Sequence, residues 1–349
     1  MPTLRSVLAL ALAPILVVAA EPERDLPLDP AVRDEVVTAV ARHVEENYLF
    51  AERARDIAAA IRVHDYTDVT TGAALAERLT ADLQAVAPDR HLKVLFSAEP
   101  RPLRDHADVP SAAEREHQRL AAIRQNFGLE RLEHLDGNVG YLKLKKFADP
   151  ALAGDAIVAA MQFLSNTDAL LIDLRLNGGG HGETVELLTS YLVDSGDGPV
   201  HLADFATRQP SQSKQSWTLP YVPGRRYLDK PVYLLTSTRT FSAAEGFAYT
   251  LQAMKRATVV GERTGGGAHF VRIFHIDAHY GVMVPVGAGT STFTGTNWQG
   301  TGITPDVEVP ADAALRRAHL LALRQPLETT HDDFADHLRT LIAEMEAQP

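Results

Sequence analysis

The sequence predicts an α/β core preceded by a small helical bundle. Between residues 30 and 86, apolar residues recur every four positions, a spacing typical of helices that bury one face. After Asp136-Gly137, short apolar runs alternate with helical segments, which indicates a sheet whose strands are largely parallel. With 349 residues, 45% of them apolar, the chain is long enough to bury a large core.

The N-terminal region, residues 21–98, contains three predicted helices. The first covers 32–48 and the third covers 75–86, after the possible cap residues Thr70 and Thr71. A shorter Ala-rich helix lies around Ile57 and Ile61. We expect their apolar stripes to face one another or the next domain.

Residues 99–135 are rich in charge and contain prolines, so we interpret them as a connector with one helical segment near 115–126. The predicted core covers residues 136–312, and residues 313–349 close the chain with amphipathic helices. The expected core elements are strands at 139–144, 169–174, 232–235, 258–260 and 306–310, helices at 152–164, 183–193 and around 247–254, and hairpins within 270–286.

Composition excludes several classes of function. The formal net charge is -11 and no dense run of Lys or Arg is present, which disfavours nucleic-acid binding. The chain has no cysteine, which excludes disulfides, thiol catalysis, Cys-ligated zinc and iron–sulfur clusters.

The first 20 residues resemble a secretory signal peptide. Arg5 precedes an apolar run at 7–20 that ends in small residues before Glu21. A membrane anchor is the alternative, but this run contains Pro14 and is shorter than the ~20 residues of a membrane span. We therefore expect cleavage near Ala20, export to the periplasm or the extracellular space, and no stable membrane span.

Three glycines follow the predicted strand at 169–174, in the stretch Asn177-Gly-Gly-Gly180. Neither a phosphate-binding loop nor a dinucleotide fingerprint has this spacing. The backbone amides of Gly178 and Gly179 are candidate donors to a small oxyanion. A tight turn between strand and helix is the alternative interpretation.

A second candidate site is the stretch Thr240-Phe-Ser242-Ala-Ala-Glu245, between a buried strand and a helix. Ser242 is either a helix N-cap with Glu245 as its capping-box partner, or a nucleophile with the Ala243 amide as an oxyanion donor. The Gly-x-Ser-x-Gly signature of α/β-hydrolases is absent.

A serine nucleophile needs a base, and several histidines are candidates. His91 ends the helical region, and His181 and His269 each follow a glycine run. His275, Asp277 and His279 would share one strand face, either as an exposed polar face or as metal ligands.

Together these segments resemble the tail-specific, or C-terminal-processing, serine protease family, which includes the tricorn protease core and the interphotoreceptor retinoid-binding protein modules. The similar stretches are the glycine turn, Thr240–Glu245, residues 260–269 and residues 297–306, in this order over about half of the chain. The resemblance implies a crotonase-like ββα-superhelix core and a serine peptidase that acts on protein or peptide substrates without metal or cofactor.

The resemblance places the nucleophile at Ser242 and the oxyanion donors at Gly178 or Gly179 and Ala243. The Lys of the Ser/Lys dyad found in many bacterial members is replaced by Gly267, whereas His91 matches the histidine of the tricorn-like and retinoid-binding-like branch. That branch tends to carry an acid where this chain has Gln299.

A PDZ domain, usual in the family, is not expected, because only about 40 residues separate Phe96 from Asp136. The leading hypothesis is an exported serine peptidase in which Ser242 attacks, His91 accepts the proton, and Gln299, helped by Glu245, orients His91. The alternatives are a binding protein that holds an apolar ligand or a peptide in the same cleft, and a hydrolase or lyase acting on a non-peptide acyl substrate.

Overall fold

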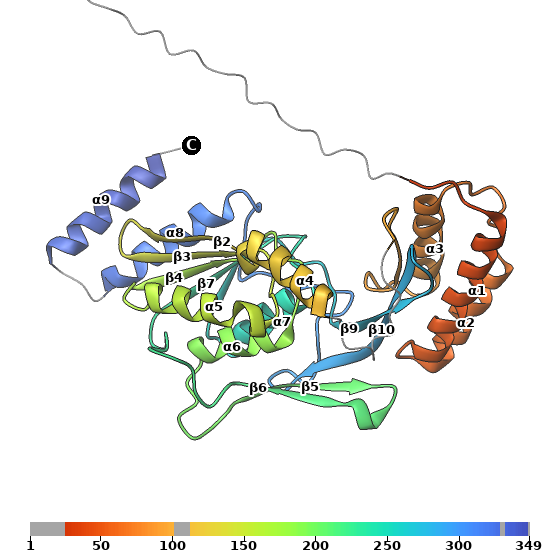
Figure 1. Ribbon diagram of the computed structural model, residues 1–349. Coiled ribbons are helices and arrows are strands. Elements are labelled where there is room, and N and C mark those ends of the chain that lie inside the picture. The colour runs from red at the N-terminus through yellow and green to blue at the C-terminus, as the bar shows by residue number, and fades with distance from the viewer. Residues whose placement is uncertain (1–24, 101–111, 329–331, 348–349) are drawn as a thin grey trace, which may run out of the picture.

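The computed structural model describes residues 25–100, 112–328 and 332–347. The predicted signal peptide at 1–20 lies outside the described residues. A helical bundle stands at one end of the molecule and an α/β core at the other, with a long β-ribbon between them (Figure 1). The predicted α/β core preceded by a helical bundle is confirmed.

The bundle consists of helices α1 (Pro30–Asn47), α2 (Ala51–Val63) and α3 (Gly72–Val86). Helix α1 begins where Asp29 accepts a hydrogen bond from the Ala31 amide and Pro30 occupies the first turn. The apolar residues spaced by four positions are buried in a shared cluster, as their spacing predicts.

The bundle core also includes residues of a β-sheet. Tyr280, Val282 and Val284 belong to strand β10 (Tyr280–Ser291), and Val94 belongs to β1 (Lys93–Phe96). All four side chains are buried with the bundle helices. The bundle is therefore packed onto the ribbon.

The ribbon is part of an antiparallel sheet. Strand β10 pairs with β9 (His269–His275) on one side. On its other side it pairs with β1 and then with β5 (His201–Thr207), which in turn pairs with β6 (Lys214–Trp217). Strands β5 and β6 had no counterpart among the elements expected from the sequence.

The core is built on a second sheet with the strand order β11-β8-β7-β4-β3-β2. Neighbouring strands are parallel except β2 and β3. In sheet order, these strands are Val307–Glu308, Thr258–Gly261, Val232–Thr236, Ala169–Asp173, Val139–Leu144 and Leu129–Leu135. The expectation of a largely parallel sheet is confirmed.

Helices cover both faces of this sheet (Figure 1). One face packs against α5 (Pro150–Leu164), α6 (Gly182–Leu192) and α7 (Ala243–Ala253). The other packs against α8 (Ala314–Arg324) and α9 (Asp333–Ala347).

The segment interpreted as a connector differs in part from that expectation. Helix α4 (Ala112–Arg124) lies near the expected helical segment, but Leu129–Leu135 forms strand β2 and pairs with β3. The last part of the 99–135 segment is therefore an edge of the core sheet. Among the helices within the described ranges, none has the length and hydropathy needed to span a bilayer.

The arrangement of β4 and β7 positions the candidate site. These strands are adjacent, parallel and buried, so their carboxyl ends lie at the same edge of the sheet. The glycine turn follows β4 and the Ser242 segment follows β7. Crevices at this edge are the usual position of sites in parallel α/β sheets.

Candidate active site

The glycine turn is held by the side chain of Asn177, which is fully buried. Its amide nitrogen donates to the Leu144 carbonyl at 2.9 Å, and its Oδ1 accepts from the Gly179 amide at 2.9 Å. The Gly179 amide is thus already engaged, whereas Gly178 is exposed. Of the two amides expected to face an oxyanion, the Gly178 amide is the one available.

Gly179 lies directly against the Ser242 segment. Its φ is 103°, and a Cβ at this position would lie 2.8 Å from the Ser242 Cβ and 2.9 Å from the Ala243 nitrogen. Only a residue without a side chain fits at these distances. The structure therefore brings Gly179, Ser242 and Ala243 together, as the sequence led us to expect.

Ser242 occupies the N-cap position of α7 with an unusual backbone conformation, φ 55° and ψ -122°. Positive φ is costly for a residue with a side chain and is often found at functional sites. The Phe241 amide donates to the Asn177 carbonyl at 3.0 Å, which fixes the segment against the glycine turn. Within the described part of the chain, the amides of Gly178 and Ala243 donate to no backbone carbonyl.

Glu245 is completely buried and binds the loop that follows β8. Its carboxylate accepts from the Ser242 amide at 2.9 Å, from the Gly266 and Gly267 amides at 2.7 and 2.8 Å, and from the Thr264 hydroxyl. Burial raises the pKa of Glu245 although these hydrogen bonds oppose the rise. Glu245 therefore connects Ser242 to the 264–267 loop.

His91 is buried against the same loop. Its ring centroid lies 4.6 Å from that of Phe241, and its Cε1 atom lies 2.7 Å from where a Cβ on Gly267 would be. The neighbouring Arg90 guanidinium lies 5.0 Å from the Phe241 ring centroid and donates to the Gly265 carbonyl at 3.1 Å. Burial lowers the pKa of His91 to about 4, so its imidazole is neutral at pH 7.

The imidazole of His91 thus lies beside the residue that immediately precedes Ser242. Over the residues described, no hydrogen bond joins His91 to Ser242, and the buried Nδ1 atom of His91 has no hydrogen-bond partner. The structure therefore brings His91 next to Phe241, the residue before Ser242, with no hydrogen bond between His91 and Ser242 among the described residues.

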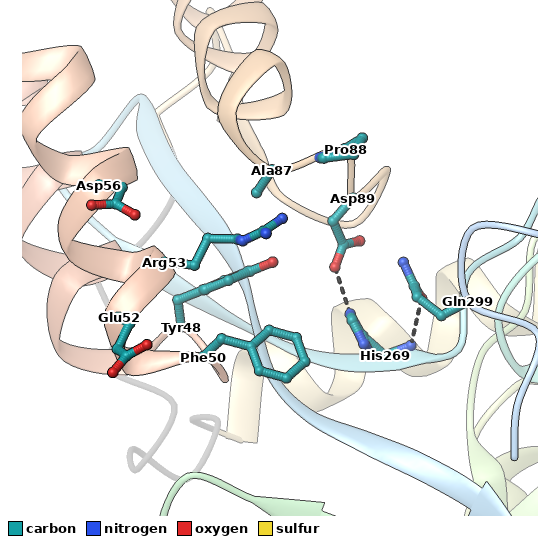
Figure 2. Close-up of a pocket in the computed structure, with 10 residues that line it drawn as sticks. All are labelled: Tyr48, Phe50, Glu52, Arg53, Asp56, Ala87, Pro88, Asp89, His269 and Gln299. Carbon is teal, nitrogen blue, oxygen red and sulfur yellow. Dashed lines mark hydrogen bonds and ion pairs between the residues drawn. The ribbon is translucent and has the colours of Figure 1, made fainter.

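Asp89 is a site residue to which the sequence analysis assigned no role. Its Oδ1 accepts from the His91 amide at 2.9 Å and lies 3.8 Å from His91 Nδ1, while its Oδ2 lies 2.6 Å from His269 Nδ1 (Figure 2). Burial alone would raise the pKa of Asp89, but the hydrogen bonds from His269 and the His91 amide hold this pKa below its usual range. The Asp-x-His spacing was the available sequence signal.

Gln299 and Glu245 were expected to orient His91, and the structure gives them other partners. Gln299 Oε1 accepts from the Ala268 amide at 2.7 Å and from the His269 amide at 3.2 Å. The hydrogen bonds of Glu245 go to Ser242 and the 264–267 loop. The carboxylate near the His91 ring is instead that of Asp89.

The other candidates take different positions. His181 is exposed at the start of α6. Asp277 Oδ1 accepts from the amides of His279 and Tyr280 at 2.7 Å, so it stabilises the turn between β9 and β10. Across the described residues, no three side chains of His, Asp or Glu are grouped to hold a metal ion, His275 and its neighbours included.

A cavity of about 560 Å³ lies between the bundle and the core (Figure 2). Tyr48, Phe50 and Arg53 line it from the bundle, and Asp89, His269 and Gln299 line the facing wall. The cavity is therefore bounded by the Asp89 carboxylate and by its hydrogen-bond partner His269.

Two family models match this chain. Residues 138–309 match Peptidase family S41, and residues 30–132 match the N-terminal domain of Peptidase_S41 in eukaryotic IRBP. Together the two matches cover well over half of the chain.

Curated relatives and a solved structure agree with these matches. The chain is 30% identical over 183 residues to the chloroplastic carboxyl-terminal-processing peptidase 1 of Arabidopsis thaliana, covering 52% of this chain and 35% of that protein. It is 27% identical over 179 residues to a carboxy-terminal-processing protease of Bartonella bacilliformis, covering 50% of this chain and 39% of that protein. It therefore spans less than half the length of either relative.

The structure of mature CPAF superimposes with a TM-score of 0.54 at 13% identity, covering 81% of this chain and 93% of that one. This similarity shows a shared fold.

Proposed function

This chain belongs to peptidase family S41, and from that premise we propose that it is an exported serine peptidase that hydrolyses peptide bonds in proteins or peptides. The observation that carries the proposal is the contact between the glycine turn and the Ser242 segment. It supports the proposal because Ser242 lies at the N-cap of α7, with the Ala243 amide beside it and Gly179 packed against both, while the preceding Gly178 is exposed.

In this proposal, Ser242 Oγ attacks the carbonyl carbon of the substrate and its proton passes to His91. The oxyanion that forms receives hydrogen bonds from the amides of Gly178 and Ala243, and the N-terminus of α7 adds a positive partial charge. His91 then protonates the leaving amine, and water releases the acyl group from Ser242 by the same steps in reverse.

His91 is the base that the local packing supports. A side chain at position 267, where many bacterial relatives carry the dyad lysine, would begin 2.3 Å from Phe241 and 2.7 Å from the His91 ring. The imidazole and a lysine at 267 therefore exclude each other. Since burial keeps His91 neutral, it is able to accept a proton at pH 7.

The missing hydrogen bond between His91 and Ser242 is compatible with this role. Catalytic hydrogen bonds are often long or absent without substrate and form in the complex. His91 belongs to the segment that follows α3, whereas Ser242 belongs to the core. We propose that a substrate bound between them draws the two parts together.

Export is proposed from the signal-like residues 1–20, and the substrate class from the names of the relatives, which are carboxyl-terminal-processing proteases. The peptide bonds cleaved would lie in proteins that share the exported compartment.

Labelling of the wild-type protein with a fluorophosphonate probe tests the nucleophile without a known substrate. We expect an adduct on Ser242, located by peptide mass spectrometry, and no adduct in Ser242→Ala. A wild-type protein that is folded by circular dichroism yet remains unlabelled would contradict the proposal.

A second candidate is a binding protein that holds a peptide or an apolar ligand without cleaving it. The observation that favours it is the absence, over the described residues, of a hydrogen bond between His91 and Ser242, together with the cavity beside Asp89 and His269. This candidate predicts no adduct on Ser242 and saturable binding of a peptide or lipid.

A further inference from the structure

We propose that Asp89 is the positioning residue of His91: its carboxylate holds the Nδ1–H of the imidazole and balances the charge that His91 gains with the Ser242 proton. This inference rests on the proposed function. The acidic partner of His91 would then be Asp89, two residues before it, and would not lie at position 299 in the core, where this chain has Gln299.

The first argument is the surroundings of His91 Nδ1. This atom is buried, and in the described structure it makes no hydrogen bond. An N–H there needs an acceptor, because a buried donor without a partner is destabilising. Asp89 Oδ1 lies 3.8 Å away, so a sub-ångström shift of the ring closes the hydrogen bond.

The second argument concerns the tautomer. A neutral imidazole carries its proton on one nitrogen and a lone pair on the other. With the proton on Nδ1 facing Asp89, the lone pair is on Nε2, which is then free to accept the Ser242 proton. The carboxylate thereby selects the tautomer that catalysis requires.

The third argument is that Asp89 is held rigidly from the core. Its Oδ2 receives the His269 Nδ1–H at 2.6 Å, and the His269 amide is bound by Gln299 at 3.2 Å. Asp89 itself is only 3% exposed. Gln299 is neutral and faces backbone amides, so it supplies no charge to the imidazole, whereas Asp89 carries a full negative charge within reach of it.

The first test replaces Asp89 with Asn and measures the rate of fluorophosphonate labelling and, once a peptide substrate is found, kcat and KM. We expect the labelling rate and kcat to fall by about 10²- to 10⁴-fold with KM little changed. Asp277→Asn makes the same chemical change at a turn carboxylate and serves as the matched control. A labelling rate of Asp89→Asn within threefold of wild type, with the fold intact, would overturn the proposal.

The second test needs no substitution at Asp89. In protein labelled with ¹⁵N-histidine, two-bond ¹H–¹⁵N correlation spectra at pH 7 distinguish the two neutral tautomers, and His91→Gln identifies the His91 signals. We expect the Nδ1–H tautomer for His91 in the wild-type protein and its loss in Asp89→Asn. An Nε2–H tautomer in the wild-type protein would rule out the assigned contact.

The two measurements separate this inference from the proposed function. If Ser242 is not labelled in wild-type protein, the peptidase proposal fails, while the tautomer of His91 still decides whether Asp89 holds its Nδ1–H. If Ser242 is labelled and Asp89→Asn is labelled equally fast, the peptidase proposal stands and the role of Asp89 is wrong.

Discussion

The Cε1 atom of His91 occupies the space in which a side chain on Gly267 would begin, since a Cβ there would lie 2.7 Å from it. The same Cβ would lie 2.3 Å from the Phe241 ring. The observed position of His91 thus requires a residue without a side chain at position 267. A side chain at position 267 therefore requires His91 and Phe241 to move.

Gly267→Ala is therefore expected to displace His91 and Phe241. We expect at least a tenfold loss of labelling rate at Ser242 and a loss of stability of about 1–3 kcal/mol from overpacking. Gly154→Ala is the control, because a Cβ at this position in α5 meets no atom within 4 Å. It should retain the wild-type rate and gain stability, by about 0.5–1 kcal/mol. A wild-type rate in Gly267→Ala would show that His91 does not need its observed position.

Gly179→Ala should inactivate the protein without replacing any of the proposed reactive groups. Its Cβ would collide with Ser242 and the Ala243 nitrogen, and its φ of 103° is unfavourable for alanine. We expect a loss of labelling rate of about 100-fold or more, as for other shifts of about 1 Å at a reacting centre. Gly182→Ala, at the start of α6, meets no atom within 4 Å and should retain the wild-type rate. Equal labelling rates in Gly179→Ala and Gly182→Ala would contradict the close contact between Gly179 and Ser242.

Substitutions at Gln299 separate its hydrogen bonding from its charge. Gln299→Leu leaves the Ala268 and His269 amides without their acceptor, and we expect a loss of about 1–3 kcal/mol in the free energy of unfolding. Gln299→Glu retains an acceptor for both amides, so it should preserve or raise activity. Urea unfolding and labelling rates measure the two effects. A large activity loss in Gln299→Glu would indicate that Gln299 contacts substrate.

The stability of the protein should fall as the pH drops from about 6.5 to about 4, in part because of His91. Its pKa is about 4 in the folded protein against 6.5 for an ordinary histidine, so the unfolded chain binds more protons in this window. The contribution of His91 to the free energy of unfolding is fully present above pH 6.5 and is lost as the pH falls toward 4. In urea unfolding at several pH values, His91→Gln should show a shallower decline than wild type. Parallel declines would mean that His91 is not buried in its neutral form.

Much of the fold follows from local patterns. The bundle helices and strands β3, β4 and β7 were predicted because a buried face or a fully apolar run appears directly in the sequence. Strand β2 was missed because its leucines, at 129, 132 and 135, are three residues apart and its other side chains are largely exposed. Strands β5 and β6 were missed because β5 is fixed by pairing with β10, which lies far away in the chain.

In the candidate site, too, the parts set by local sequence were predicted and the parts set by distant contacts were not. The Ser242 and glycine segments were found because each is a compact motif that follows a buried strand. The contact of Asp89 was not predicted, because its carboxylate binds His269, which lies 180 residues further along the chain. The expected orientation of His91 by Gln299 was based on resemblance, and the hydrogen bonds of Gln299 go to backbone amides instead.

The shared strand β10 has a practical consequence for anyone seeking a minimal protease domain. Tyr280, Val282 and Val284 belong to the C-terminal half of the sequence, yet they complete the interior of the N-terminal helices. Removing the residues before position 97 would leave these side chains in water and free one edge of a long strand, which invites aggregation. The helical bundle and the core therefore have to be expressed together. Precipitation of a truncated core would give no information about the reactivity of Ser242.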